Sequence, residues 1–552
     1  MRVRRSLVPV LLIAVLSTGT LAQQAPARGG ISEPDLKAWL TYLASDELQG
    51  RATYSEGLGL AAGYIASHLA QWGVTPGGDN GSYFQAVRVR GVRTTSNASV
   101  TVTVDGQSRT FKDGEGITFL RQMGSRQTVE GRDILFAGYG LQIPAADIDD
   151  YAGREANGKV VVYLGARGPS TLPQGSNRLL GARSRSAVEK GAVAVIAPAS
   201  PFRGRAGTPP QAPSAGGRGR GAAPVAADFT TVQRYDAPAT PQLTAQDEFF
   251  EFLFSGSGVA YADLKAKADN GEPLPAVALE GVRITIDVDA AYEVVRTRLT
   301  NNVVGIVEGT DPKLKDTYVA FGAHYDHTGF RETAKPGEDA INNGADDDGS
   351  GTVAIMSIAK AFAQGPKPKR SLLFVWHAGE ESGLLGSRYM ADNPVGGDID
   401  KIIAQLNMDM VGRNQNDDPS HANMVLVVGS DRISTELHNI NEDANASLEQ
   451  PLTLDYSMND PADPQSIYTR SDHYSYAARG VPIIFYFTGL HPDYHRPSDT
   501  VDKIVFDKVR RIAQLAYETG RRVANLDRPP AKDHLGPRAG KGFSGKLEAE
   551  RR

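Results

Sequence analysis

The second half of the chain alternates short apolar runs with helix-like segments, and this alternation restricts the fold more than any other feature. The strand-like runs lie at 303–307, 318–323, 372–376, 402–406, 424–428 and 481–487, and a long helix-like segment closes the series at 506–525. Strands that alternate with helices favour one mostly parallel sheet with helices packed on its faces. We therefore expect an α/β domain over residues 293–528, with a mostly parallel central sheet flanked by helices.

The residues before this domain divide into two sections. Residues 32–74 have helical spacing, and apolar residues then alternate over 100–104 ahead of an Asp-Gly turn at 105–106, which is a hairpin signal. We assign the whole of 23–125 to the same domain as 293–528. Residues 126–292 contain further short strands, and we expect them to form a separate β-rich insert.

Two segments have compositions that oppose a packed core. Residues 202–224 are nearly all Gly, Pro, Ala, Arg and Ser, which predicts a flexible surface loop. An RNA-binding Arg-Gly tract is the alternative, but the segment is short and has no aromatic residues on which bases could stack. Residues 529–552 are rich in Pro, Gly and charge, and we expect a disordered tail.

The first residues resemble an export signal. Arg2, Arg4 and Arg5 precede an apolar run at 7–16, and small residues at 20–22 suit a cleavage site. The apolar run is far shorter than the roughly 20 residues that span a bilayer, so we expect a signal peptide at 1–22 and no stable membrane anchor. The expected location is periplasmic or secreted. The arginine pair is compatible with a general or a twin-arginine export route.

The amino-acid composition restricts the metal ligands and the kinds of partner that the chain can have. The chain has no cysteine, so it forms no disulfide, and any bound metal must be held by nitrogen and oxygen ligands. Its formal net charge is −5 and becomes more negative without the leader arginines. No basic stripe follows the rest of the sequence, so we do not expect nucleic acid as a partner. The sequence makes no prediction about oligomeric state.

Five clusters of His, Asp and Glu follow the expected strands or the loops after them. They are His324-Tyr325-Asp326, Asp346-Asp347-Asp348, Glu380-Glu381, Asp409 and His495. Open α/β sheets bind ligands at this edge. So many carboxylates at one edge would repel one another unless cations neutralise them or some stay protonated.

A divalent metal is the simplest way to neutralise these clusters. Two imidazoles with several carboxylates and no thiolate suit zinc, and less specifically cobalt or manganese. They outnumber the three protein ligands of a typical single catalytic zinc. The clusters therefore predict a site for two metal ions.

The order of these motifs resembles peptidase family M28. The resemblance is carried by His324-x-Asp326, the run Gly344-Ala345-Asp346-Asp347-Asp348-Gly349-Ser350-Gly351, the run Glu380-Glu381-Ser382-Gly383-Leu384-Leu385-Gly386-Ser387, Asn407-x-Asp409 and Tyr494-His495-x-x-x-Asp499-Thr500. Residues 126–292 are similar to a protease-associated (PA) domain through Gly138-Tyr139-Gly140, Asp150-Tyr151 and Gly158-Lys159-Val160. The expected architecture is thus a zinc exopeptidase fold with an inserted PA domain.

The M28 resemblance assigns roles to the clustered residues. It implies two Zn²⁺ ions per chain, one held by His324 and Asp409, the other by Glu381 and His495, with Asp347 bridging them. A shift of one residue would make Asp346 or Asp348 the bridge instead. Glu380 would be the general base, and the resemblance also implies a cis peptide bond between Asp347 and Asp348.

Four further residues have expected roles beside these ligands. Asp326 would orient the His324 imidazole, and Asp499 would do the same for His495. Tyr494, adjacent to His495, would donate to the developing oxyanion, or else serve only in packing. Arg470 would contact substrate, or else pair with a neighbouring carboxylate.

The expected activity is removal of N-terminal residues from peptides or proteins. Acidic residues around a two-metal centre can hold a free α-ammonium, whereas a carboxypeptidase needs a basic cluster that the sequence does not reveal. The same scaffold resembles carboxypeptidases and glutaminyl cyclases, so both remain alternatives. A different alternative is an inactive binding protein that keeps the fold and uses the PA domain for protein contacts.

Overall fold

The computed structural model describes residues 30–143, 146–173, 175–199, 230–331, 334–540 and 543–548. The expected signal peptide at 1–22 and the expected loop at 202–224 lie outside these residues. Among the helices within these ranges, none combines the length and apolar character that crossing a membrane requires.

The described chain contains helices and strands in an order that matches the alternation seen in the sequence. The helices are α1 (Glu33–Leu43), α2 (Glu56–Gln71), α3 (Asn177–Glu189), α4 (Asp247–Phe254), α5 (Tyr261–Asn270), α6 (Gly351–Gln364), α7 (Leu385–Asp392), α8 (Thr435–Ala446), α9 (His473–Ala477) and α10 (Phe506–Ala524). The strands of the first half are β1 (Thr75–Pro76), β2 (Phe84–Ser96), β3 (Ser99–Val104), β4 (Gln107–Lys112), β5 (Ile117–Phe119), β6 (Gln127–Ala137), β7 (Gln142–Ile143), β8 (Ile148–Asp149), β9 (Val160–Val162), β10 (Ala194–Pro198), β11 (Thr230–Val232) and β12 (Gln242–Ala245). The later strands are β13 (Ala276–Val288), β14 (Ala290–Val307), β15 (Tyr318–His324), β16 (Ser371–His377), β17 (Ile402–Met408), β18 (Met424–Val428), β19 (Thr453–Asp455) and β20 (Ile483–Phe487).

The larger sheet has ten strands and mixes parallel and antiparallel pairs, with a run of four parallel strands at its centre and one more parallel pair, β18 with β19, at an edge. Its order is β11-β2-β14-β16-β15-β17-β20-β18-β19, with β1 beside β14. Strands β16, β15, β17 and β20 run parallel, whereas β14 on one side and β18 on the other pair antiparallel to them. The expected mostly parallel sheet is therefore confirmed for the centre but not for the flanks. The difference arises on one side because β14 enters the sheet as the return strand of a hairpin-like ribbon with β2.

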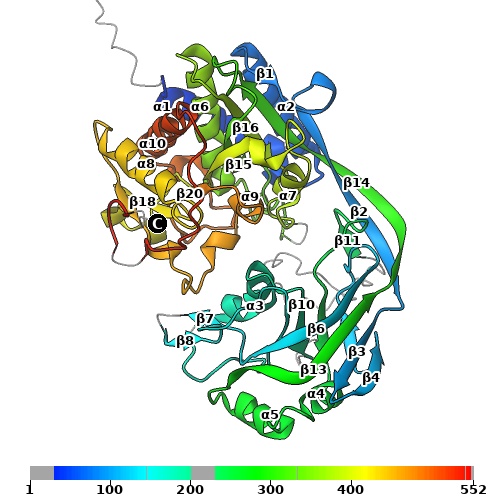
Figure 1. Ribbon diagram of the computed structural model, residues 1–552. Helices are drawn as coiled ribbons and strands as arrows, with labels where there is room; N and C mark the ends of the chain where they lie inside the picture. Colours follow the sequence, from blue (N-terminus) through cyan, green and yellow to red (C-terminus); the bar gives the residue numbers. More distant parts are fainter. Residues whose placement is uncertain are drawn as a thin grey trace, which may run out of the picture.

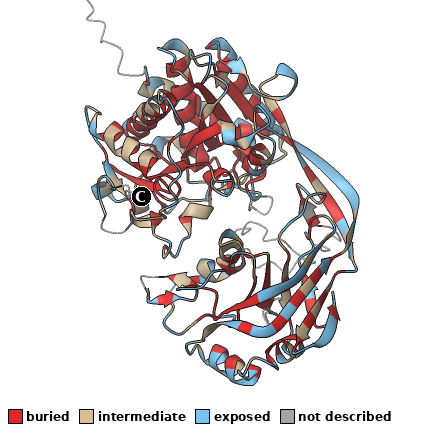
Figure 2. Ribbon diagram, viewed as in Figure 1, coloured by how far each residue is buried: buried red, intermediate tan, exposed pale blue. Residues whose placement is uncertain are grey.

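Helices cover both faces of this sheet. Leu372, Phe374 and Trp376 of β16 pack into a core with α1, α2, α6, α8 and α10, whereas Leu373 and Val375 face α7 and α9. A strand buried on both faces reads as a continuous apolar run, which is why the sequence revealed it. Figures 1 and 2 show these strands as a buried layer between the helices.

The smaller sheet belongs to a second domain that begins earlier than expected. Its eight strands have the order β4-β3-β13-β6-β9-β10-β12-β5, with α4 and α5 packed on one face and α3 on the other. The hairpin β3-β4 pairs with β13, and its apolar residues enter the core of this sheet. The second domain thus starts near residue 97, so the expected boundary at 126 is wrong.

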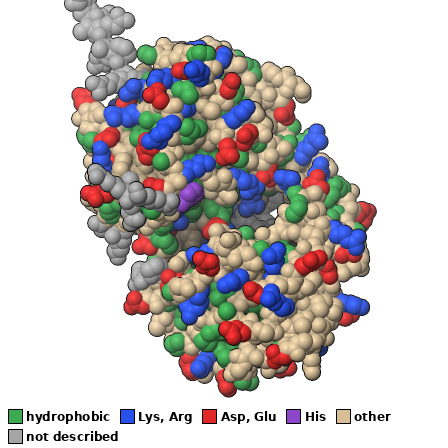
Figure 3. All heavy atoms as spheres, in the orientation of Figure 1, with side chains coloured by type: hydrophobic (Ala, Val, Ile, Leu, Met, Phe, Trp, Pro, Cys, Tyr) green, Lys and Arg blue, Asp and Glu red, His purple; other side chains and the backbone are tan. Residues whose placement is uncertain are grey.

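A long two-stranded ribbon joins the two domains. Strands β2 and β14 pair along nearly their whole length, from Phe84 opposite Val303 to Ser96 opposite Ala290. Figures 1 and 2 show this ribbon curving between the domains with an exposed middle part. A space-filling view shows a hollow between the two domains (Figure 3).

The domains also meet on the far side of this hollow. Arg185 of α3 donates to Thr469 Oγ1 at 3.0 Å, and the Tyr474 hydroxyl donates to Glu189. A cleft of about 260 Å³ beside these contacts is lined by residues of both domains, among them Leu141 and Tyr468. The second domain therefore borders the loop that carries Arg470.

The C-terminal residues 529–540 and 543–548 do not form the disordered tail that we expected. They lie against α8 and the loop before it (Figure 1). Asp431 accepts hydrogen bonds from the backbone of Arg538 and Ala539, and Asn439 accepts one from Leu547. Side chains of the domain thus satisfy the tail backbone, and this mode of attachment leaves no apolar periodicity in the sequence.

The Gly138-Tyr139-Gly140 turn of the second domain is built around Asp150. Asp150 Oδ2 accepts from Leu141 N at 2.9 Å. Gly138 has a positive φ of 49°, and a Cβ there would lie 2.9 Å from Asp150 Oδ1. Burial raises the pKa of Asp150 to about 6. A folded-state pKa above the unfolded value of 3.8 contributes stability that is present at low pH and lost as pH rises through 6.

Replacing Asp150 with asparagine should therefore stabilise the second domain at neutral pH. The full shift corresponds to about 3 kcal/mol, which solvent screening of this half-buried group reduces to about 1–2 kcal/mol. We expect the metal-free Asp150→Asn variant to unfold at a higher temperature than wild type at pH 7, with the difference vanishing near pH 4. A lower unfolding temperature at pH 7 would show that the ionised carboxylate stabilises the turn.

Candidate metal centre

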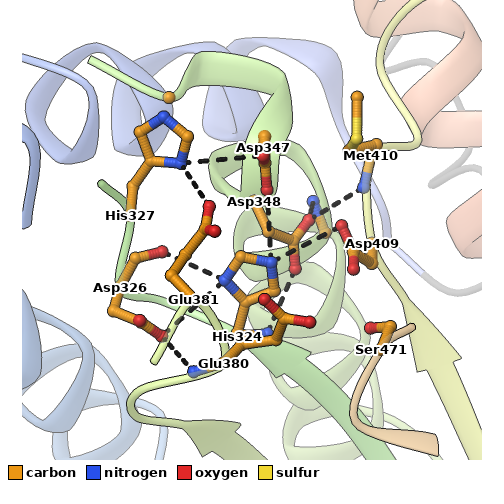
Figure 4. A network of polar contacts seen from close by, with 12 residues as sticks. His324, Asp326, His327, Asp347, Asp348, Glu380, Glu381, Asp409, Met410 and Ser471 are labelled. Carbon is orange, nitrogen blue, oxygen red and sulfur yellow. Dashed lines mark hydrogen bonds and ion pairs between the residues drawn. The ribbon is translucent and has the colours of Figure 1, made fainter. Parts of the chain in front are cut away.

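The strand ends of the larger sheet bring the predicted residues together. His324 ends β15, Glu380 and Glu381 follow β16, Asp409 follows β17, and His495 lies in the loop after β20. Because these four strands are parallel, their carboxyl ends meet at one edge. Asp347 joins them from the turn before α6. Figure 4 shows side chains of this group pointing toward one another.

Asp347 lies between two imidazoles. Its Oδ1 is 3.3 Å from Nε2 of His324, and its Oδ2 is 3.1 Å from Nε2 of His495. Asp409 Oδ1 lies 3.5 Å from the same nitrogen of His324, and Glu381 Oε1 lies 3.0 Å from that of His495. The Asp347 carboxylate thus offers one oxygen to each of two His-carboxylate pairs. The peptide bond between Asp347 and Asp348 is cis, which confirms that expectation.

The two neighbouring aspartates are occupied by other partners. Asp346 Oδ1 accepts from Gly412 N, and its Oδ2 lies 3.3 Å from His491 Nε2. Asp348 also lies near His324 and Asp409. Its carboxylate, however, already accepts from three backbone N–H groups, those of residues 324, 351 and 410. Of the three aspartates, Asp347 alone presents oxygens to both imidazoles.

The His324 imidazole is fixed in one tautomer when neutral. Its Nδ1 lies 3.0 Å from the backbone oxygen of Asp326, and a carbonyl can only accept, so Nδ1 carries the proton. Nε2 then presents its lone pair toward Asp347 and Asp409. The Asp326 carboxylate is farther, at 3.7 Å, and accepts instead from Glu380 N and Thr53 Oγ1. Asp326 thus positions His324 through its backbone and the Glu380 loop through its side chain.

Asp499 does not contact His495 in the way that we expected. Its carboxylate accepts from the backbone N–H groups of Asp346 and Asp347 at 3.0–3.1 Å. Asp499 therefore holds the turn that presents Asp347. The two residues are close in sequence, but the positive φ of 58° at His495 changes the chain direction between them.

The pKa values of the histidines and carboxylates in the centre depend strongly on the charges of their neighbours. Burial acts to lower the pKa of His495, yet the Asp347 and Glu381 carboxylates raise it to about 10. Burial acts to raise the pKa of Asp347, but the surrounding imidazoles hold it well below its ordinary value. The carboxylates are thus ionised only because positive charge lies beside them, a role that metal cations also fill.

The donor atoms fit a metal. Asp347 Oδ2, Glu381 Oε1 and His495 Nε2 are buried atoms that have no hydrogen-bond partner among the described residues, although His495 Nε2 lies 3.1 Å from the first oxygen and 3.0 Å from the second. Polar atoms that lie this close together without hydrogen-bonding to one another have the arrangement of ligands around a shared cation. Nitrogen and carboxylate donors without sulfur suit zinc.

A small cavity lies beside these residues. His324, Asp347, Glu380 and Asp409 form its polar wall, and Tyr494 and Arg470 also line it. The apolar part of its wall consists of Met410, Ile467, Phe485, Phe487 and Leu490. Burial, with the Glu381 and Asp409 carboxylates, raises the pKa of Glu380 well above its ordinary value, although His324 opposes the shift.

Arg470 and Tyr494 contact each other at this cavity. Arg470 Nη2 donates to the Tyr494 hydroxyl at 3.3 Å, and Nη1 lies 3.5 Å from Gln465 Oε1. Arg470 thus contacts a hydroxyl and an amide oxygen at the cavity, and its expected contact with substrate stays a prediction. The Tyr494 ring stacks on the His495 ring at a centroid distance of 3.8 Å.

Our sequence prediction omitted His327. Its Nδ1 lies 3.1 Å from Glu381 Oε1 and 3.7 Å from Asp347 Oδ2 (Figure 4). The signal for it was present, because His327 directly follows the His324-x-Asp326 motif after the same strand. Without an independent reason to place this loop residue inside the cluster, the sequence did not distinguish it from a surface histidine.

The family follows from the segment that holds this centre. The sequence model of peptidase family M28 matches residues 302–520, which include all five predicted ligands. The segment that holds the centre therefore matches peptidase family M28. The resemblance expected from the sequence is thereby confirmed for the M28 domain, whereas the assignment of the second domain as a PA domain stays a prediction.

Curated relatives share the M28 segment. The chain is 28% identical over 303 residues to leucine aminopeptidase 2 of Arthroderma otae, covering 50% of this chain and 54% of that protein. It is 32% identical over 238 residues to a probable leucine aminopeptidase 2 of Aspergillus oryzae, covering 43% and 42%. The chain thus spans about half the length of the curated relatives it matches.

One solved structure that the chain matches is the aminopeptidase from Aneurinibacillus sp. strain AM-1. It has 18% identity to this chain and a TM-score of 0.43, and the match covers 94% of this chain and 98% of that one.

Proposed function

We propose that this chain is an exported zinc aminopeptidase that removes N-terminal residues from peptides at a two-metal centre. The observation that carries the proposal is the position of Asp347, whose two oxygens face two separate His-carboxylate pairs. The match to the M28 family and relatives named leucine aminopeptidase support the peptidase class. Export rests on the sequence pattern at 1–22.

The residues at the cavity can take different roles in peptide hydrolysis, some as metal ligands and one as the general base. His324 and Asp409 would hold one Zn²⁺ ion, Glu381 and His495 the other, and Asp347 both. Zinc bound there would supply Lewis-acid activation of water and of the scissile carbonyl. Glu380, at the cavity wall, would accept the proton of the attacking water and return it to the leaving amine.

Tyr494 is oriented to donate a hydrogen bond. Because the Arg470 guanidinium donates to the Tyr494 oxygen, the hydroxyl proton is free to point elsewhere. In the cavity it would donate to the substrate carbonyl oxygen as that oxygen gains negative charge. Arg470 would thus act through Tyr494.

Changing Tyr494 to phenylalanine should lower kcat by about 100-fold, because one donor to the oxyanion is lost. The KM should change by less than about threefold, since the ground-state carbonyl needs this hydrogen bond less. Tyr468→Phe is a matched control, because Tyr468 lies in the neighbouring loop and stacks on Arg432 instead. Equal effects of the two substitutions on kcat would show that Tyr494 serves only in packing.

The side chains that line the cavity bear on the direction of cleavage. The carboxylates of Glu380 and Asp409 suit a free α-ammonium, and the apolar wall suits an apolar side chain such as leucine. Arg470 at the same cavity could bind a free carboxylate, and this observation makes carboxypeptidase the second candidate.

Mass spectrometry of a decapeptide digest separates these functions. The proposal predicts a ladder of products shortened from the N-terminus. A ladder from the C-terminus would identify a carboxypeptidase, and loss of ammonia from an N-terminal glutamine without cleavage would identify a glutaminyl cyclase. An unchanged peptide would favour a binding protein.

A further inference from the structure

His327 is held rigidly beside the metal centre. It is 1% exposed, and its backbone N–H donates to Arg51 O at 3.1 Å. The buried Arg51 guanidinium in turn donates to the backbone oxygens of Tyr325, Asn343 and Gly344, which fixes both flanking loops. The His327 ring lies close to Gly344, where an added Cβ would approach ring atoms to 2.6 Å. The ring therefore has little freedom to turn away.

Four buried atoms lie close together here, and one of them is the Nδ1 atom of the His327 ring. His327 Nδ1 and His495 Nε2 lie 3.1 and 3.0 Å from the same Glu381 oxygen, and 3.7 and 3.1 Å from the same Asp347 oxygen. None of the four has a hydrogen-bond partner within the described ranges. Zinc bonds of about 2.0–2.2 Å place tetrahedral ligand atoms about 3.3–3.6 Å apart. The observed distances between these ligand atoms, 3.0–3.7 Å, include the distances expected for ligands of one tetrahedral zinc ion.

A purely orienting role fits His327 less well. An imidazole that orients Glu381 would aim its Nδ1–H at the carboxylate, yet the pair lies at bonding distance without bonding geometry. His327 Nε2 also has no partner among described residues, so nothing fixes the proton on Nδ1. In the tautomer with the proton on Nε2, the Nδ1 lone pair faces the Glu381 and Asp347 oxygens. His324 differs, because its Nδ1 is tied to Asp326 and only Nε2 is available.

We propose that His327 is a sixth protein ligand of the centre, binding the zinc ion held by Glu381, His495 and Asp347. This inference rests on the metal centre proposed above. The ion beside His327 would then have four protein ligands, while the ion beside His324 and Asp409 would have three. Four ligands are typical of closed zinc sites and three of sites with an open position. The two ions are therefore unequal, and the His327 site fills first.

X-ray absorption of the wild-type protein with one equivalent of zinc tests this without a substitution. The proposal predicts two imidazoles on the bound ion, His327 and His495. Scattering from a single imidazole would overturn it. A wild-type protein that binds no zinc would overturn the proposed function as well, whereas one that binds two ions with a single imidazole on the first overturns only this inference.

A substitution gives the second readout. In His327→Ala, the affinity for the first zinc ion, measured by chelator competition, should fall more than about 100-fold, because loss of a ligand exceeds the 10–100-fold effect of an outer partner. His491→Ala is the matched control, since it removes a buried imidazole that contacts Asp346 instead. We expect a change below about tenfold there. An unchanged first affinity in His327→Ala would overturn the proposal.

Discussion

Replacing Glu380 with glutamine should lower kcat for a leucyl dipeptide by about 10³-fold, within the range for loss of a general base. Glutamine keeps the size of the side chain but cannot accept the proton of water. Glu380 N is held by Asp326 Oδ1 at 3.1 Å, and this contact is unaffected by the change. The loop that carries Glu381 should therefore keep its position.

Metal content separates this role from a structural one. The Glu380→Gln protein should still bind two zinc ions per chain, and its KM should stay within about threefold of wild type. Loss of one ion would place Glu380 among the metal ligands instead. Activity within about tenfold of wild type would rule out Glu380 as the base.

Replacing Asp347 with asparagine should weaken both metal sites at once and reduce hydrolysis to background. The amide removes the negative charge that faces His324 on one side and His495 on the other. We expect the affinity for each ion to fall by more than the roughly 10–100-fold that loss of an outer partner costs. Metal analysis after dialysis should find less than one ion per chain.

Asp346→Asn is the matched control for this change. Asp346 precedes Asp347, but its carboxylate contacts His491 and Gly412 N rather than the two central imidazoles. Its effect on either metal should be much smaller. The fold should survive in Asp347→Asn, because Asp499 still accepts from the backbone at 346 and 347. Loss of only one ion in Asp347→Asn would contradict a bridging position.

The parts of the fold that the sequence predicted are those with a local signal. Strands β15, β16 and β17 are buried on both faces, so each reads as an uninterrupted apolar run. Parallel strands gather their carboxyl ends, so residues placed after them were expected together. This reasoning brought His324, Glu381 and Asp409 to one edge.

The parts that it missed depend on contacts between distant segments. Strand β3 alternates in the same way whichever sheet it joins, and only its pairing with β13 assigns it to the second domain. Asp499 was expected beside His495 because the two are close in sequence, whereas the chain path directs it to the backbone of Asp347. His327 enters the centre because Arg51 holds the loops around it.

Hydrolysis of a free leucyl dipeptide beside its N-acetylated form, before chelation, after chelation and after zinc is restored, tests the proposed activity most directly. We expect cleavage of the free dipeptide only, loss of that cleavage on chelation, and recovery that is complete when two zinc ions per chain are bound. Cleavage that persists after every metal ion has been removed, or that acts equally on the acetylated dipeptide, would contradict the proposed activity.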